Sequence, residues 1–356
     1  MYTFNPGPSA VYPAVRGYLQ DAFDEGWLSA PHRGERFTGL LRQTVADMKA
    51  KLNIPQDYTI FFLSSATECW EVLAQSLTPT KSFHLYSGAF GEKWFEYAKA
   101  LRPASTGQLF GLDELPEIYT LPLPDESGDT DLVCITQNET SNATQLRDGF
   151  ILNLYNRLGN ALLAVDATSS MAGIQLKYIK ADIWFGSVQK CFGLPAGLGI
   201  MVLSPRALAR ARSINERGHY NSLTAQYEKM LNFQTTHTPN VLGLYLLSRV
   251  LADREPIKVV HQHLQDRAAK LYEYFEQATQ LTPLVTNPET RSTTVVALQG
   301  APALIDEVKR RAQAQGLQLG NGYGTWKAGS LRIANFPAIP DAAYEQLVQF
   351  FAREFA

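Results

Sequence analysis

Apolar residues follow two spacings along the chain, and the two spacings alternate. Short apolar runs predict buried strands, each followed by a stretch in which apolar residues recur at helical spacing. The predicted strands are residues 58–63, 82–86, 132–136, 162–165, 183–185 and 200–203. The predicted helices are residues 14–24, 36–52, 68–77, 92–101 and 150–158. This order predicts an α/β fold with a mainly parallel sheet that helices cover on both faces.

The pattern changes in the last third of the chain. Residues 238–251 and 259–280 predict two helices, the second long and amphipathic, which links two domains. Beyond them lie predicted strands at 293–298, 317–319 and 330–333 and helices at 303–315 and 341–354. We therefore expect an N-terminal arm over residues 1–15, a large domain over 16–250 and a smaller α+β domain over 251–356. Pro6, Gly7 and Pro8 predict that residues 1–10 form an extended arm without regular secondary structure.

Composition excludes some partners. The chain has 356 residues, is 45% hydrophobic and carries a formal net charge of −2, so nothing favours nucleic acid or an anionic membrane as the main partner. We find no apolar run near the roughly 18 to 20 residues that span a bilayer, and no N-terminal signal pattern. We expect a cytoplasmic enzyme.

The three cysteines are Cys69, Cys134 and Cys191. They are scattered, lack the paired spacing of a metal site and lie in apolar segments, which predicts reduced, buried thiols and no metal. Cys191 beside Lys190 could act as a nucleophile, but no base is visible near it in the sequence, so packing is the favoured role.

Lys190 carries the strongest chemical signal. It lies in a glycine-rich stretch, Gln189-Lys190-Cys-Phe-Gly-Leu-Pro-Ala-Gly, where apolar neighbours lower the pKa of an amine and a tight backbone holds it still. Upstream, the buried run 162–165 delivers Asp166 at its carboxyl end, where open α/β sheets bind ligands. A carboxylate there can pair with the protonated pyridine nitrogen of pyridoxal 5′-phosphate (PLP). The pair predicts a PLP site with Lys190 as the Schiff-base lysine, although a solvated lysine and a helix-capping aspartate are the ordinary alternatives.

A second signal lies between the first predicted strand and its helix. Residues 64–68, Ser-Ser-Ala-Thr-Glu, form a small-residue turn whose amides and helix N-terminus suit a phosphate. An ordinary serine or threonine cap, with Glu68 in the first turn, explains the same residues.

The order of these motifs resembles the class V aminotransferases among the fold-type I PLP enzymes, and within them the phosphoserine aminotransferases. The likeness runs from Asn5-Pro-Gly-Pro8 to Ser330-Leu-Arg-Ile-Ala-Asn-Phe-Pro337. It implies that Lys190 binds the cofactor covalently and that Asp166 contacts its ring nitrogen. It also implies cofactor contacts from Ala66, Thr67, Thr140 and Gln189. Phe90 takes the place of a stacking tryptophan, with Trp94 as the competing assignment.

The same resemblance implies how substrate binds. Arg332 matches the arginine that pairs with the substrate α-carboxylate, and Ser9 is the expected backbone partner of that group. A structural ion pair is the alternative for Arg332. His32 and Arg33 match a pair that reaches the substrate phosphate in phosphoserine aminotransferases, although an isolated pair of this kind is usually solvated surface. Two departures bear on that phosphate: Thr67 or a neighbour replaces a common arginine, and Trp326-Lys327 replaces a common His-Arg.

His237 and Thr238 lie in a segment that resembles a loop crossing a twofold dimer to the partner's PLP phosphate. Histidine stands where asparagine is usual, and a helix cap before Pro239 is the alternative. The resemblance thus implies a homodimer with shared active sites. It implies transfer between phosphoserine and 2-oxoglutarate, a step of serine biosynthesis, with small amino acids and keto acids as partners.

Three alternatives stay open at this point. One is another class V enzyme, such as an alanine–glyoxylate or serine–pyruvate aminotransferase or a desulfurase-like lyase, although a lyase of that kind needs a cysteine on a mobile loop. A second is a PLP-fold protein that binds without turnover. A third, a dinucleotide-binding protein, lacks the Gly-x-Gly-x-x-Gly fingerprint after the first strand.

Overall fold

The computed structural model describes residues 1–123, 130–277 and 280–355, and its centre is a seven-stranded sheet. The strand order, from edge to edge, is β2 (Thr59–Leu63), β10 (Gly199–Leu203), β9 (Ile183–Ser187), β8 (Leu162–Asp166), β5 (Leu132–Thr136), β3 (Ser82–Tyr86) and β4 (Thr106–Leu109). All neighbouring pairs are parallel except those that β10 makes with β9 and β2. The predicted mainly parallel α/β sheet is confirmed.

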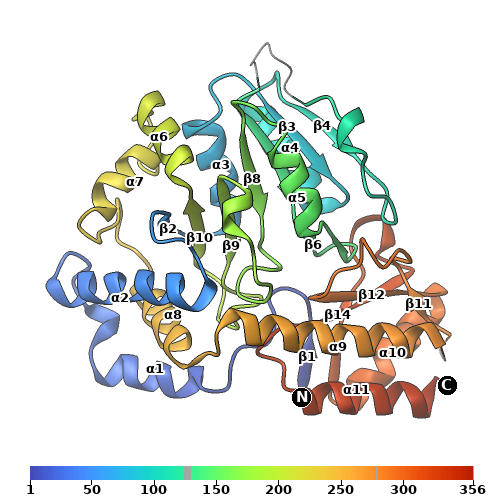
Figure 1. Ribbon diagram of the computed structural model, residues 1–356. Coiled ribbons are helices and arrows are strands. Elements are labelled where there is room, and N and C mark those ends of the chain that lie inside the picture. The colour runs from blue at the N-terminus through green and yellow to red at the C-terminus, as the bar shows by residue number, and fades with distance from the viewer. Residues whose placement is uncertain (124–129, 278–279, 356) are drawn as a thin grey trace.

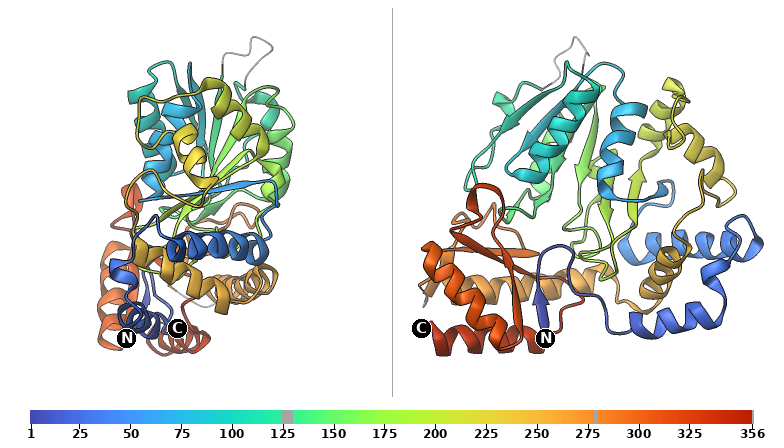
Figure 2. Two further views of the ribbon diagram at one scale, coloured as in Figure 1. Left: turned by 90° about the vertical axis from the view of Figure 1, so that its left-hand side faces the viewer. Right: turned by 180° about the vertical axis from the view of Figure 1, so that it is seen from behind.

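Helices cover both faces of this sheet, as the alternation of its strand residues requires. On one face, Val133 and Val165 join a core with α5 (Asp148–Tyr155). On the other, Cys134 and Ala164 join a second core with α3 (Ala66–Ser76) and α4 (Ala89–Leu101). Figures 1 and 2 show α3 and α4 together on one side of the sheet and α5 on the opposite side. The large domain also contains α6 (Pro205–Ile214), α7 (Leu223–Met230) and the two-residue strands β6 (Asn138–Glu139) and β7 (Thr144–Gln145).

A separate group of helices flanks the sheet at the lower left of Figure 1. It consists of α1 (Val15–Asp24), α2 (Glu35–Leu52) and α8 (Val241–Asp253), and α8 contacts both of the others. Shortly after the end of α8, α9 (Ile257–Gln277) begins and runs across the molecule to the second sheet. The predicted helix over 259–280 corresponds to α9, and its predicted residues 278 and 279 lie outside the described residues.

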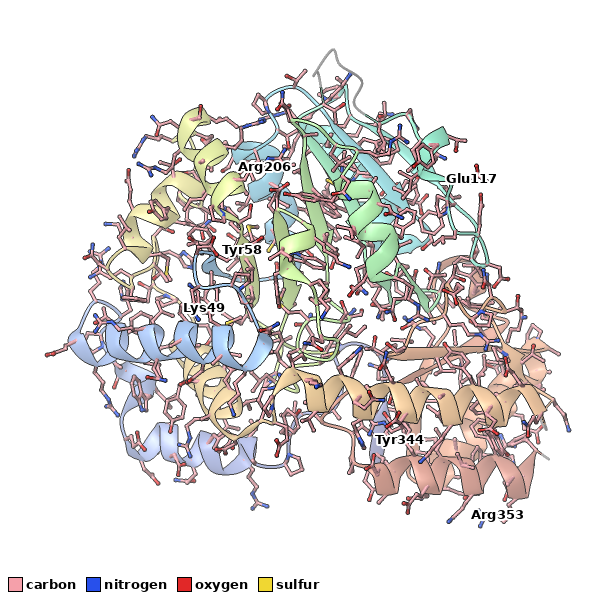
Figure 3. The ribbon with its side chains drawn as sticks, viewed as in Figure 1. Lys49, Tyr58, Glu117, Arg206, Tyr344 and Arg353 are labelled. Carbon is pink, nitrogen blue, oxygen red and sulfur yellow. The ribbon has the colours of Figure 1, made fainter. Side chains whose placement is uncertain are left out.

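The second sheet has five strands in the order β1 (Tyr2–Phe4), β13 (Leu317–Asn321), β14 (Ser330–Ala334), β12 (Val295–Gln299) and β11 (Thr282–Pro283). It is accompanied by α10 (Pro302–Ala314) and α11 (Asp341–Glu354). Tyr344 of α11 lies between that helix and α9 (Figure 3), donates a hydrogen bond to Ala334 O (2.7 Å) and carries the guanidinium of Arg267 4.0 Å from its ring centroid. The α+β character of the C-terminal third agrees with the pattern; the domain boundaries remain a prediction.

One expectation about the N-terminus is wrong. Residues 1–10 contain regular structure, because Tyr2–Phe4 pairs in parallel with Leu317–Leu319 and becomes an edge strand of the second sheet. This strand lies before the first proline of the chain, so each of its backbone amides can still donate a hydrogen bond. Figure 2 shows β1 beside the C-terminal elements in the view from behind. The arm is therefore anchored by the C-terminal sheet, and its Pro6, Gly7 and Pro8 reach the cavity described next.

Candidate active site

A cavity of about 390 Å³ lies where the central strands end. Thr136 and Asp166 close β5 and β8, and they are opposite each other in the strand register. Lys190 follows the end of β9, and Arg332 enters from β14 of the second sheet. Because the carboxyl ends of parallel strands meet at one edge, residues far apart in the sequence converge here.

Lys190 is 6% exposed, and its amine points at two hydroxyl groups. Nζ lies 2.5 Å from Thr140 Oγ1 and 2.8 Å from Ser169 Oγ. Burial lowers the pKa of Lys190 to about 8, against the opposing effect of the Asp166 and Glu139 charges. Burial thus shifts this amine toward its neutral form, the form in which a lysine acts as nucleophile or base.

Asp166 is the acid of the cavity, and it is 4% exposed. Its Oδ1 accepts a hydrogen bond from Thr168 N (2.8 Å). Burial raises the pKa of Asp166, while Thr168 and the Lys190 charge lower it. A buried carboxylate of this kind is stabilised by a cationic partner, as a protonated ring nitrogen would be.

The turn before α3 combines the cap and the cradle that the sequence left as alternatives. Ser65 Oγ accepts from Glu68 N (3.0 Å), and Glu68 Oε2 accepts from Ser64 N (2.7 Å). The first helical amides, at Ala66 and Thr67, have no partner inside the helix. Both residues line the cavity, so they present a helix N-terminus to any anion bound there. Gly199 permits the close approach of β10, because a Cβ at that position would lie 2.4 Å from Ser65 O.

Phe90, and not Trp94, lines the cavity. Trp94 is 2% exposed and packs edge-on against His84 and Phe185, with ring centroids 5.2 and 5.0 Å away. Phe90 is held by Glu139, whose Oε2 accepts from the amides of Phe90 and Gly91, both at 3.1 Å. This buried carboxylate holds the backbone at the start of α4, and the Phe90 ring centroid lies 5.3 Å from Lys190 Nζ.

Arg332 is 7% exposed and joins the second sheet to the loop after β6. Its Nε donates to Asn321 O (2.7 Å) and its Nη1 to Thr140 O (2.8 Å). Burial lowers the pKa of Arg332 to about 10, so it remains cationic at neutral pH. Within the described ranges Arg332 forms no ion pair, which leaves its charge available to an anion in the cavity.

Comparison with known proteins identifies the family. The sequence model of Aminotransferase class-V matches residues 121–323, more than half of the chain. The chain belongs to the class-V aminotransferase family.

Similar proteins agree with this family. A phosphoserine aminotransferase from Rhodococcus opacus is 28% identical over 97% of this chain and 93% of its own, and one from Rhodococcus jostii is 27% identical over the same shares. The solved structure of a phosphoserine aminotransferase from Cytophaga hutchinsonii is 30% identical, with a TM-score of 0.93 over 99% of this chain and 98% of that one. An alanine–glyoxylate aminotransferase from Nostoc shares the fold, with a TM-score of 0.80 at 18% identity over 99% and 94% of the two chains. The predicted fold type, aminotransferase class and PLP cofactor are confirmed.

The cavity of this class-V aminotransferase fits PLP by its own chemistry. Two buried oxygens that line it, Thr136 Oγ1 and Asn138 Oδ1, have no hydrogen-bond partner among the described residues. Such atoms call for a polar ligand. The N-terminus of α3 suits the phosphate of PLP, and Asp166 suits the ring nitrogen of PLP. 

Thr140 and Gln189, which are also predicted to contact the cofactor, line the cavity as well. Gln189 Oε1 accepts from Ser187 Oγ (2.5 Å), which fixes the side chain at the cavity wall.

Five predicted residues do not line the cavity of the single chain. His32 and Arg33 lie on the loop before α2, and His237 and Thr238 on the loop before α8. His237 instead meets Tyr220 edge-on, with ring centroids 5.7 Å apart. Ser9 N donates to Gln189 O (3.0 Å), so this amide is already engaged. The roles of all five stay predictions.

Sequence reasoning missed several cavity residues. Ser169 contacts Lys190 directly, and Tyr323, Lys93, Trp70 and Tyr97 form other parts of the wall. Ser169 follows Asp166 by three positions, so its place after a strand-end acid was the one available signal. The others come from helix faces and a loop, where sequence spacing carries no sign of the cavity.

The cysteines are buried and unpaired, as expected. Burial raises the pKa of Cys191 to about 12, and its Sγ donates to Ser169 O (3.2 Å). A protonated thiol with this contact supports the Ser169 backbone and does not act as a nucleophile. In the described part of the chain, no helix combines the length and apolar character needed to cross a membrane.

Proposed function

We propose that this class-V aminotransferase interconverts phosphoserine and 2-oxoglutarate with 3-phosphohydroxypyruvate and glutamate, as a cytoplasmic homodimer of serine biosynthesis. The observation that carries the transfer chemistry is the convergence of Lys190, Asp166 and Arg332 on one cavity. The names of the near full-length relatives favour phosphoserine as the amino acid.

The residues divide the work between binding and proton transfer. When bound, PLP supplies an electron sink that weakens the bond between Cα and its hydrogen. Arg332 holds the α-carboxylate and so orients the amino acid over the cavity floor. With the cofactor bound, Lys190 Nζ would take the α-proton of the amino acid and hold it for return, a role that suits an amine whose pKa burial lowers. Asp166 keeps the ring nitrogen protonated.

Half-reactions test this proposal. PLP-loaded protein is mixed separately with phosphoserine, glutamate and alanine, and the absorbance of the bound cofactor is followed. Rapid change with phosphoserine and glutamate, but not with alanine, supports the proposed substrate. Change with alanine alone moves the enzyme to another class V reaction, such as alanine–glyoxylate transfer. No change with any amino acid supports a binding protein without turnover.

Lys190→Ala provides the matching variant. It should lose turnover, because both the covalent attachment point and the proton carrier are gone, yet retain cofactor through the α3 N-terminus and Asp166. Transamination at the wild-type rate in this variant would refute the assigned role.

The dimer accounts for the predicted residues that lie away from the cavity. If Arg33 serves the partner's site, Lys190→Ala and Arg33→Ala chains should complement each other when mixed. Equal mixing should regain about a quarter of wild-type activity, because about half of the dimers are mixed and each holds one complete site. No recovery, with dimers present by sedimentation, would assign Arg33 to its own chain or to no site.

A further inference from the structure

One cation at the cavity has no part in the chemistry above. Among the described residues, the cations that line the cavity are Lys190, Arg332 and Lys93. Lys93 lies on the exposed side of α4, and its Nζ donates to Tyr323 Oη at 2.9 Å. The contact joins the large domain to the loop after β13 of the second sheet.

Tyr323 forms a wall of the cavity between two positive charges. Its ring stacks on Phe90, with centroids 5.3 Å apart and an interplanar angle of 26°. The guanidinium carbon of Arg332 and Nζ of Lys93 both lie 5.4 Å from the Tyr323 ring centroid. The Tyr323 ring therefore lies close to both Arg332 and Lys93, two cations that line the same cavity.

The Lys93–Tyr323 pair has donors to spare. Tyr323 Oη accepts from the ammonium group, so its own O–H remains free to donate, and the ammonium keeps two further N–H groups. This hydrogen bond raises the pKa of Lys93, so the group stays charged. Together the two side chains offer a compact set of donors to an anion, with the charge-assisted geometry that favours phosphate or carboxylate oxygens.

We propose that Lys93 and Tyr323 form a subsite for the second anionic group of the amino acid, the group remote from the α-carboxylate. The ligand class is an amino acid with an anionic side chain, either a phosphate ester or an ω-carboxylate. This inference rests on the proposed transamination, with Arg332 holding the α-carboxylate. It places a distal-anion contact on α4 and the loop after β13, in addition to whatever His32 and Arg33 contribute.

Steady-state kinetics of Lys93→Met test the subsite. KM for phosphoserine and for glutamate should rise roughly 10- to 100-fold, because each loses a charge-assisted contact. We expect alanine to react only slowly, so its kcat/KM is measured at high enzyme concentration. This value should stay within about twofold of wild type, since alanine has no distal anion. Lys93→Arg should restore most of the affinity, and Tyr323→Phe should keep the ring and lose a smaller share.

Lys99→Met is the matched control. Lys99 lies on the same helix, its Nζ is 5.5 Å from the Phe95 ring centroid, and it does not line the cavity. Unchanged KM values in Lys93→Met, or an equal loss with alanine, would overturn the subsite. If wild-type protein ignores phosphoserine but reacts with glutamate, the proposed substrate fails, and the glutamate series still decides the role of Lys93.

Discussion

Replacing Ser169 with alanine should lower the pKa of Lys190 in the cofactor-free protein. Ser169 is 1% exposed, and its Oγ lies 2.8 Å from Lys190 Nζ. The hydroxyl accepts from the ammonium form and thus stabilises it against the neutral amine. Removing the acceptor favours loss of the proton at lower pH, and burial already lowers the pKa of this lysine to about 8.

The size of the effect follows from the contact. A hydrogen bond to a charged group contributes about 1.5 to 3 kcal/mol, and 1.36 kcal/mol corresponds to about one unit of pKa. Thr140 keeps its own contact with Nζ at 2.5 Å and compensates in part. We therefore expect the pKa of Lys190 in Ser169→Ala to be roughly 1 lower than in the wild type.

Acetic anhydride labelling at a series of pH values measures this directly, with the label on Lys190 quantified by peptide mass spectrometry. Ser170→Ala is the control, because Ser170 is also fully buried but its hydroxyl faces Ala167 O at 3.4 Å and makes no contact with the lysine. An unchanged or higher pKa in Ser169→Ala, with Ser170→Ala at the wild-type value, would refute the reasoning.

Three further changes test the packing and charge around the site. Gly7→Ala should cut activity roughly 10-fold, because its Cβ would lie 3.0 Å from Lys190 Cε, whereas Gly17→Ala has open space and should raise helix stability by up to about 1 kcal/mol. Activity and urea unfolding distinguish the two. Burial lowers the pKa of His84 from 6.5 to about 3, so the unfolded state binds a proton first as pH falls. His84 should cost about 1.6 kcal/mol of stability between pH 6.5 and 5, and His84→Gln should remove that part of the acid sensitivity. Arg332→Lys should raise KM for amino acids at least about 10-fold, since a point charge cannot reproduce the guanidinium fork. A KM equal to that of the wild type would contradict the carboxylate role.

Elements with a strong periodic pattern could be predicted closely from the sequence. The helix over 341–354 has the same bounds in the structure, and the strand that ends at Asp166 was placed by its buried run. In contrast, β4 is a short, mostly exposed edge strand, Thr-Gly-Gln-Leu, which has no apolar alternation to reveal it. β1 forms only because a distant partner, β13, supplies its hydrogen bonds.

In the candidate site, too, residues with a local sequence signal could be predicted and residues brought together by tertiary packing could not. Lys190 and Asp166 were predictable because a strand end and a glycine-rich turn restrict their chemistry locally. Tyr323 and Lys93 were not, because their meeting depends on how the second sheet packs against α4. The choice between Phe90 and Trp94 also needed coordinates, since the helical phase alone does not tell which ring faces the cavity and which packs on His84.

The most direct test of the central claim is to find where the cofactor is attached. PLP-loaded protein is reduced with borohydride, which makes the link between cofactor and lysine permanent, then digested and mapped by mass spectrometry. The account predicts the pyridoxyl mass on the peptide that contains Lys190, and no stable label in Lys190→Ala. A label on another lysine, with Lys190 unmodified in active protein, would contradict it.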